Sequence, residues 1–471
     1  MSKSVLAIDI GSTKICAVIA EIDGGNIQVI GHGISKSQGV KKGIITNIEL
    51  ASKSIRKALN DARRIAGKNI SSATVSISNA YAKSLNSTGV VNVPQKDIST
   101  KEINRLMETA LYNANIPNEY EVIHVLPYNF RVDDQDSIED PYGMNASRLE
   151  VDANIILTQK TSLSNLKKTV RSAGLEIDGI VLNSYASSIA TLQVDEKELG
   201  AAVIDMGGQT SNLVIHLGNS IHYNSFLGVG SNHITNDLSM ALHTPLQIAE
   251  KVKIDHADLV NGTFEMIELP VIGDEENKNS ISLEIVHNVV MARVEEALSI
   301  LSNSIEKSGL ADQIGAGIVL TGGMTKLKGI RELAQAIFRN SPIRIGLPRE
   351  IGGMTDDLKD PAFSTVVGLL MYQSGKHTQY EINNDKEMLH SKIDAQDIEL
   401  RNIKLDEEKK STIVEHKRVE TQSHSTSTRR AARNSEHEVT NDSFSFDDLP
   451  KPEKSDGNII TKTSNWLKQL F

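Results

Sequence analysis

The sequence predicts a two-lobed α/β protein, and two observations support this prediction. From residue 1 to about residue 375, short β-branched runs alternate with segments of helical period, a pattern typical of layered α/β domains. Residues 7–19 (AIDIGSTKICAVI) also align without gaps to residues 203–215 (VIDMGGQTSNLVI), so the chain contains an internal repeat. A repeat of this kind indicates two related lobes within the 471 residues.

Composition narrows the class of protein. The net charge of −10 argues against a nucleic-acid-binding protein, which would need clustered Lys and Arg to neutralise phosphates. The single cysteine, Cys16, excludes an internal disulfide framework and a Cys-rich metal site. The first residues lack the apolar core and cleavage site of a signal peptide, and no run reaches the roughly 18 apolar residues of a membrane-spanning helix. We therefore expect a cytosolic protein whose contact with membranes, if any, is peripheral.

Each copy of the repeat reads as a buried strand, an Asp, a Gly-containing turn and a second strand, which is a β-hairpin with exposed backbone N–H groups in its turn. A single Asp-Gly hairpin need not bind any ligand, but two hairpins that face each other could bind a phosphate chain from both sides. Glycine allows close approach, and hydroxyl and ammonium groups donate to phosphate oxygens. The predicted phosphate-binding residues are Gly11, Ser12, Thr13 and Lys14 in the first hairpin and Gly207, Gly208 and Thr210 in the second.

The two hairpins also supply acidic residues for a metal ion. Asp9 and Asp205 occupy equivalent places in the repeat. Mg²⁺ keeps several of its waters and takes few protein ligands, so two carboxylates that hold its waters, together with phosphates, are sufficient. We expect Asp9 and Asp205 to bind Mg²⁺ through water.

A third glycine-rich element lies at residues 315–329 (GAGIVLTGGMTKLKG). It reads as a strand, a Gly322-Gly323 turn and a helical run, an arrangement that presents bare backbone and a helix amino terminus to a ligand. We predict that Gly322, Gly323 and Met324 lie against the base or ribose of a nucleotide.

Two Asp-Gly hairpins followed by a TGG turn resemble the ATPase fold shared by actin, sugar kinases and heat-shock chaperones. This resemblance implies an actin-like fold with ATP and Mg²⁺ between its lobes. Residues 247–255 (QIAEKVKID) resemble the ribose-binding helix of bacterial actins, which implies that Glu250 and Lys253 bond ribose hydroxyls; a solvated helix face remains the alternative. Residues 343–372 resemble the end of the core in the FtsA family of bacterial actin-like cell division proteins.

The resemblance to FtsA implies a division into domains. Helices at Asn183–Leu192 and Ala362–Leu370 would lie between the lobes, and a small α+β subdomain would be inserted in the first lobe. Within this subdomain, a Ser99 or Thr100 cap predicts a helix start near residue 100. The expected boundaries are 1–82, 161–195 and 356–375 for the first lobe core, 83–160 for the inserted subdomain, 196–238 and 311–355 for the second lobe core, and 239–310 for the small subdomain of the second lobe.

Two departures from the wider superfamily bear on ATP hydrolysis. Gln209 stands where relatives commonly have a third Gly, so we expect its side chain to crowd the phosphates. The first interlobe segment (LNSYASSIATL) offers no Asp or Glu to activate water, and a general base must reach its proton directly. We name no catalytic base and expect ATP binding with weak or no hydrolysis.

Beyond the core, residues 376–457 are polar and poor in large apolar side chains, which predicts a disordered linker that could form a helix only around residues 385–410. The chain ends in a segment at 458–471 whose apolar residues share one helical face. Such a face, with the only Trp on it, fits a membrane-surface helix, and a helix in a protein groove is the alternative. The predicted membrane-binding residues are Ile459, Ile460, Trp466, Leu467, Leu470 and Phe471.

The family resemblance implies a function. It implies a peripheral protein on the cytoplasmic face of the cell membrane at the division site, which assembles into actin-like filaments and tethers FtsZ polymers to the membrane. FtsZ would bind about residues 239–310, and other division proteins would bind residues 83–160. A pilus-assembly ATPase or a small-metabolite kinase of the same superfamily remains the alternative, whereas a chaperone is excluded by the polar tail in place of a β-rich substrate domain.

Overall fold

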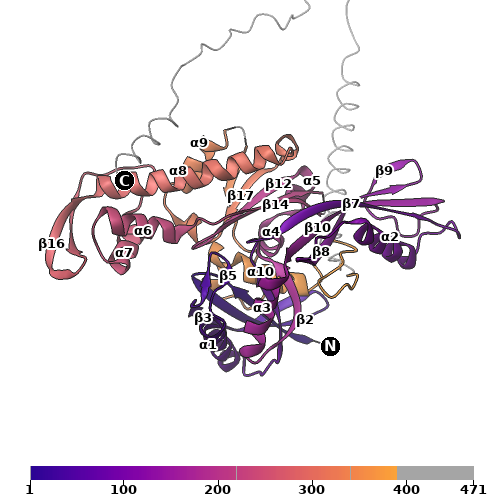
Figure 1. Ribbon diagram of the computed structural model, residues 1–471, viewed down its shortest axis with the longest axis horizontal. Helices are drawn as coiled ribbons and strands as arrows, with labels where there is room; N and C mark the ends of the chain where they lie inside the picture. The colour runs from indigo at the N-terminus through magenta and orange to yellow at the C-terminus, as the bar shows by residue number, and fades with distance from the viewer. Residues whose placement is uncertain (1, 219, 340, 390–471) are drawn as a thin grey trace, which may run out of the picture. The chain divides into compact units, whose positions relative to one another are not determined.

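The computed structural model describes residues 2–218, 220–339 and 341–389 of the chain. These residues form two five-stranded sheets, one four-stranded sheet and two small two-stranded ribbons, with helices packed against them (Figure 1). The layered α/β architecture predicted from the sequence is confirmed.

The sheet of the first lobe has the order β11-β6-β1-β2-β3. Its central hairpin joins β1 to β2 antiparallel, β3 continues antiparallel to β2, and β6 and β11 are parallel to β1 on the other side. The strands are β1 (Lys3–Ile10), β2 (Lys14–Asp23), β3 (Asn26–Lys36), β6 (Ser72–Ile77) and β11 (Glu176–Leu182).

The sheet of the second lobe repeats this arrangement. Its order is β14-β13-β12-β17-β18, with an antiparallel hairpin at its centre and two parallel strands on one side. The internal repeat seen in the sequence therefore extends from one hairpin to a whole sheet. The strands are β12 (Ala201–Met206), β13 (Ser211–Leu217), β14 (Ser220–Leu227), β17 (Gly317–Thr321) and β18 (Ile343–Ile345).

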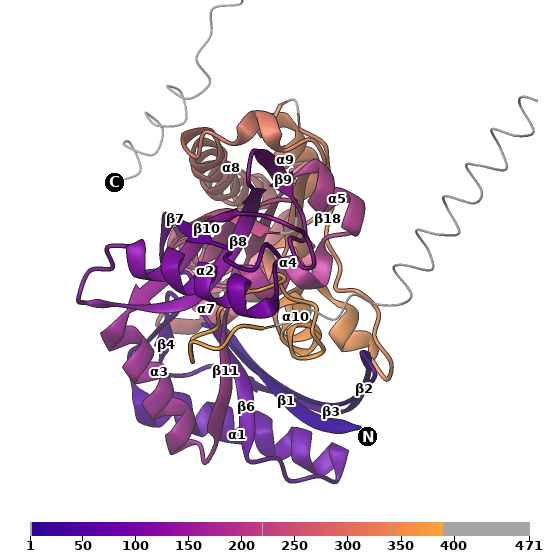
Figure 2. The ribbon, with the colours of Figure 1, turned by 90° about the vertical axis from the view of Figure 1, so that its right-hand side faces the viewer.

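Helices cover both faces of the first-lobe sheet (Figure 2). On the outer face lies α1 (Ile48–Ala66), which begins at an Asn47 cap and ends at Gly67 in the left-handed conformation. The inner face packs on α10 (Ser364–Gln373), which crosses α4 (Asn183–Thr191) so closely that a Cβ on Gly368 would lie 1.8 Å from the carbonyl oxygen of Ala186. The helix α4 lies within the segment expected at Asn183–Leu192, and α10 overlaps the segment expected at Ala362–Leu370 but continues to Gln373. Also in the lobes are α3 (Lys160–Ser172), α5 (Val194–Leu199), α9 (Ile330–Ile337), β4 (Val40–Lys41) and β5 (Ile44–Ile45).

Two further groups of elements lie on opposite sides of the two lobes in space (Figure 1). One follows β6 and has a four-stranded sheet, ordered β7-β10-β8-β9, with a helix that begins at a Ser99–Glu102 capping box. The other follows β14 and ends in the longest helix of the described residues. The elements of the first group are β7 (Lys83–Asn92), α2 (Thr100–Asn113), β8 (Tyr120–Val132), β9 (Gln135–Ile138) and β10 (Arg148–Gln159). The elements of the second group are α6 (Ser231–Ala241), α7 (Leu246–His256), β15 (Met266–Val271), β16 (Asp274–Ser282) and α8 (Leu283–Lys307).

The sequence predicts a disordered linker from residue 376, but the structure shows that this prediction is wrong for residues 376–389. Tyr380 and Ile382 are buried, and the backbone of Ile382 exchanges two hydrogen bonds with Val125 on β8, at 2.9 and 3.0 Å. The polar composition of residues 376–457 as a whole concealed Tyr380 and Ile382, which are two residues apart and so point to the same face of an extended segment. Residues 385–389 form turns and a bridge, not the start of a helix.

The remainder of the predicted linker and the whole predicted terminal helix at 458–471 lie outside the described residues. Within the described ranges, no helix has the length and apolar character needed to cross a bilayer.

Candidate nucleotide-binding site

The two hairpins of the repeat have matching geometry. In the first, Asp9 is paired with Cys16 and the N–H of Gly11 donates to the carbonyl of Lys14 at 3.1 Å. In the second, Asp205 is paired with Asn212 and the N–H of Gly207 donates to the carbonyl of Thr210 at 2.8 Å. The same tight turn thus follows the same Asp in both lobes.

These turns face each other across the gap between the lobes. A Cβ built on Gly208 would lie 1.7 Å from Oγ1 of Thr13, and a Cβ on Gly11 would lie 2.7 Å from the carbonyl oxygen of Lys14. No side chain fits at either position without movement of the chain. Gly208 therefore lets the two turns approach each other, and Gly11 keeps its own turn tight.

A cavity of about 230 Å³ lies between the hairpins. All the residues predicted to bind nucleotide line it except Lys253. Gln209, which was expected near the phosphates, also lines the cavity. The lining residues that were not predicted from the sequence are Asn183, Asn212, Ser231, Asn232, Ala362 and Thr365.

The two predicted magnesium-binding carboxylates are nearly buried in this cavity. Oδ1 of Asp9 accepts from the Ser76 hydroxyl at 2.9 Å, and Oδ2 of Asp205 accepts from Ser187 at 2.5 Å and Thr365 at 3.2 Å. Burial raises the pKa of both carboxyl groups, an effect that these hydrogen bonds oppose. A cation held near both carboxylates would favour their ionised forms.

The glycine turn after β17 lies directly against Asp205. Gly322 has a φ of 90°, and a Cβ there would lie 2.4 Å from Oδ1 of Asp205. Gly323 is less confined, because its Cβ would meet only the Cβ of Ala362 within 4 Å, at 3.4 Å. Gly322 is therefore required by the fold, whereas Gly323 leaves an open surface in the cavity wall.

Only one of the two residues predicted to bind ribose faces the cavity. Glu250 on α7 lines the cavity, but Lys253 is buried behind it, where its ammonium group donates to Glu250 and Ser231 at 2.7 Å and to Thr235 at 2.9 Å. Lys253 therefore orients Glu250 and the first turn of α6, and it does not face the nucleotide position expected for it.

Comparison with known proteins identifies the family. Residues 202–368 match the family of cell division protein FtsA, and residues 79–157 match the SHS2 domain that is inserted in FtsA. The chain is 42% identical over 410 residues to cell division protein FtsA of Helicobacter pylori strain J99, covering 80% of this chain and 83% of that protein. It is 37% identical to FtsA of Pseudomonas aeruginosa, covering 79% and 89%.

The chain belongs to the FtsA family of cell division proteins. Among solved structures, the PilM–PilN type IV pilus biogenesis complex aligns with a TM-score of 0.56 at 16% identity, covering 79% of this chain and 98% of that one. At this identity the likeness shows the shared actin-like fold.

One expected departure from the superfamily has a different structural outcome. The side chain of Gln209 turns toward the first lobe, where its Oε1 accepts from the N–H of Lys42 at 2.8 Å. Gln209 therefore links the two lobes at the edge of the cavity, although it had been expected to crowd the phosphates.

Two asparagines give this FtsA-family cavity further polar character. Among the described residues, neither Oδ1 of Asn183 nor Oδ1 of Asn212 has a hydrogen-bond partner, although both atoms are buried. A buried acceptor of this kind normally binds water or a ligand. The repeat contained a signal for Asn212, because this polar residue aligns with the apolar Cys16 of the first copy.

The donor set fits Mg²⁺ held through water. In the part of the chain that the structure describes, no three His, Cys, Asp or Glu side chains are grouped to hold a metal directly. Asp9 and Asp205 are close enough for the charge of Asp205 to raise the pKa of Asp9. Two such carboxylates suit an ion that keeps most of its waters.

Proposed function

We propose that this FtsA-family protein binds ATP with Mg²⁺ between its lobes. The observation that carries the proposal is the pair of facing hairpins with glycines where any side chain would collide. Gly11, Ser12, Thr13 and Lys14 would hold the phosphates from one side, and Gly207, Gly208 and Thr210 from the other. Asp9 and Asp205 would hold the waters of Mg²⁺, which neutralises phosphate charge. Glu250 would bond the ribose, and the adenosine would lie on Gly322, Gly323 and Met324.

Hydrolysis by this site would be weak or absent. Asn183 and Asn212 offer the cavity amide groups, which can orient a water but do not accept a proton near neutral pH. The lining acids are Asp9, Asp205 and Glu250, and each already accepts hydrogen bonds within the protein. A metabolite kinase would need a free base beside its substrate, so the structure favours bound ATP as a conformational switch. Family membership likewise favours a role in division over the pilus-assembly alternative.

In the cell, the protein would tether FtsZ polymers to the inner face of the cytoplasmic membrane and assemble into actin-like filaments. The residues proposed to bind lipid are the apolar face of 458–471. Burying Trp466 and its neighbours in the interface would supply most of the adhesion, because the two lysines of this segment add only about 1 kcal/mol each toward anionic lipid.

Co-sedimentation with liposomes tests the membrane role. We expect Trp466→Glu to stop the full-length protein from pelleting with anionic vesicles while ATP binding is unchanged, because a carboxylate on the apolar face must be desolvated. Asn465→Glu is the matched control, since this position falls on the opposite side of the predicted helix and should leave pelleting intact. Pelleting of the Trp466 variant like wild type would show that the tail binds a protein groove instead.

The proposed FtsZ-binding surface, about residues 239–310, exposes large apolar side chains. Phe264 is 78% exposed, and Met240, Leu246, Ile254, Met266 and Ile272 are each more than half exposed. Exposed apolar groups concentrated in one subdomain are typical of protein interaction sites. We expect Phe264→Glu to weaken FtsZ binding, whereas Tyr112→Glu, at an 88% exposed position on α2 of the inserted subdomain, should leave it unchanged. Equal effects of the two variants would place FtsZ elsewhere.

A further inference from the structure

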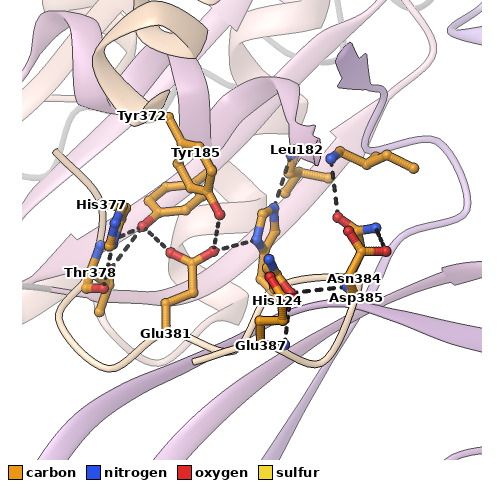
Figure 3. Close-up of polar contacts among 12 residues, drawn as sticks. His124, Leu182, Tyr185, Tyr372, His377, Thr378, Glu381, Asn384, Asp385 and Glu387 are labelled. Atoms are coloured by element: carbon orange, nitrogen blue, oxygen red, sulfur yellow. Dashed lines mark hydrogen bonds and ion pairs between the residues drawn. The ribbon is translucent and has the colours of Figure 1, made fainter. Parts of the chain in front are cut away.

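The segment after α10, residues 376–389, forms a polar network with the core (Figure 3). We call this segment the strap. It bridges three regions, because its residues bond β8 of the inserted subdomain, β11 of the first lobe and the two interlobe helices. Besides the pairing of Ile382 with Val125, the side chain of Asn384 accepts from the N–H of Ile180 on β11 at 3.1 Å.

Glu381 is the centre of the network and is fully buried. Its carboxylate accepts three hydrogen bonds, from the hydroxyl of Tyr185 at 2.9 Å, the hydroxyl of Tyr372 at 2.8 Å and Nδ1 of His124 at 2.7 Å. The N–H of Leu182 donates to Nε2 of His124 at 3.1 Å, so the proton of the neutral ring lies on Nδ1. Three neutral donors thus surround one buried carboxylate.

These contacts hold the strap firmly. The charge of Glu381 adds to burial in raising the pKa of Tyr185 and of Tyr372 well above the ordinary value, so both hydroxyls keep their protons and remain donors. Loss of the carboxylate would leave buried donors without an acceptor, which is more costly than the bonds themselves. The position of Glu381 therefore depends on α4 and α10, and the reverse is also true.

The same two helices reach the proposed nucleotide site. Tyr185 lies on α4 between Asn183, which lines the cavity, and Ser187, which donates to Asp205. On α10, Tyr372 lies about two turns beyond Thr365, which also donates to Asp205. One buried carboxylate of the strap thus touches both helices that hold the magnesium-binding Asp205.

We propose that Glu381 is a positioning residue for the nucleotide site. By fixing Tyr185 and Tyr372 it sets the placement of α4 and α10, and so the hydrogen bonds of Ser187 and Thr365 to Asp205. This inference rests on the proposed binding of ATP.

A pair of conservative variants distinguishes a role in positioning the nucleotide site from a role in stabilising the fold alone. Tyr185→Phe removes the hydroxyl that links the strap to α4. Tyr380→Phe removes a hydroxyl of the strap itself, which donates to Asp140 of the inserted subdomain at 2.7 Å and does not involve α4. We expect Tyr185→Phe and Glu381→Gln to weaken Mg-ATP affinity by about three- to tenfold, in the range of measured coupling between sites, and Tyr380→Phe to change it less than twofold.

Hydrogen exchange gives a second readout. If the strap biases the site, binding must bias the strap equally. Mg-ATP should therefore slow exchange at the N–H of Ile382, which donates to Val125, in wild type and not in Tyr185→Phe. Unchanged exchange in the strap on ATP binding, or equal loss of ATP affinity in Tyr185→Phe and Tyr380→Phe, would overturn the proposal. Glu381 would then only stabilise the fold.

Failure of the proposed ATP binding would be recognised separately, because wild type itself would then bind no nucleotide. The link from strap to helix is still tested in that case by exchange in the ATP-free proteins. Tyr185→Phe should speed exchange in the chain around Ser187, and Tyr380→Phe should not. Equal exchange in the two variants would reject the link itself.

Discussion

The two lobes share a sheet but differ in what they present to the cavity between them. The first hairpin offers side-chain donors, with Lys14 lying 3.8 Å from the centre of the Phe363 ring and donating to the carbonyl of Ala362. The second offers mainly backbone, with Gly207 and Gly208 in its turn, and Gln209 reaching to the first lobe. The two copies of the repeat keep the same backbone turn but differ in their side chains, so the two hairpins offer different donors to the cavity.

The lobes also differ in where extra elements are inserted. In the first lobe the additional sheet follows β6, the parallel strand, whereas in the second lobe the additional helices and ribbon follow β14, the edge strand. Neither insertion interrupts the central hairpin. The second-lobe insertion supplies Ser231, Asn232 and Glu250 to the cavity, whereas no described residue of the first-lobe insertion lines it. Substitutions in the two insertions should therefore differ in their effect on the site.

The largest effect is expected at the glycine turn, which only the second lobe contributes. Gly323→Trp should abolish ATP binding, because its side chain would occupy the cavity wall proposed for adenosine. Gly323→Ala is the control, since its Cβ would make only an ordinary contact with Ala362. Fluorescence titration with labelled ATP measures both, and unchanged affinity in a folded Trp variant would remove this turn from the site.

The next effect concerns the crossing of α4 and α10, where the lobes meet. Gly368→Ala would place a Cβ 1.8 Å from the carbonyl of Ala186, so the helices must separate. We expect the free energy of unfolding to fall by about 2–3 kcal/mol, as for an overpacked core. Denaturant unfolding would show this, with Gly179→Ala as a comparison, since a Cβ there would make only ordinary contacts with Thr74, at 3.5 and 3.7 Å. A loss no larger than that of the comparison would mean that the crossing is loose.

A third prediction separates stability from function at Asp205. The folded-state pKa is raised, so the native protein binds a proton more readily than the unfolded chain and loses stability as pH rises through that pKa. Asp205→Asn should therefore unfold at no lower temperature than wild type at neutral pH without Mg²⁺. It should weaken Mg-dependent ATP binding by about tenfold and Mg-free binding less, because only the former uses the charge. Equal loss with and without Mg²⁺ contradicts this role.

The smallest effect should come from Gln209, which stands in the second hairpin where the first has Thr13. Gln209→Gly removes its hydrogen bond to Lys42 but leaves the backbone turn, so ATP affinity should change by at most about fivefold, because one neutral hydrogen bond contributes about 1 kcal/mol. A gain of much more than this would show that Gln209 does crowd the phosphates in the bound state.

The sequence predicted the hairpins, the glycine turn and the two-lobed fold because each depends on local patterns: alternating burial, Asp-Gly turns and an ungapped repeat. It could not predict that Lys253 turns inward to Ser231 and Thr235, since helical spacing places Glu250 and Lys253 on one face without saying which is deeper. Glu381 was missed for a related reason. A charged residue in a polar segment reads as solvated unless its partners, here His124, Tyr185 and Tyr372, are known from the fold.

A crystal structure with Mg²⁺ and a non-hydrolysable ATP analogue would test most directly whether the paired hairpins hold Mg-ATP between the lobes. We expect the phosphates between Gly11–Lys14 and Gly207–Thr210, with Mg²⁺ linked through water to Asp9 and Asp205. A nucleotide bound elsewhere, or phosphates in contact with one hairpin only, would contradict this expectation.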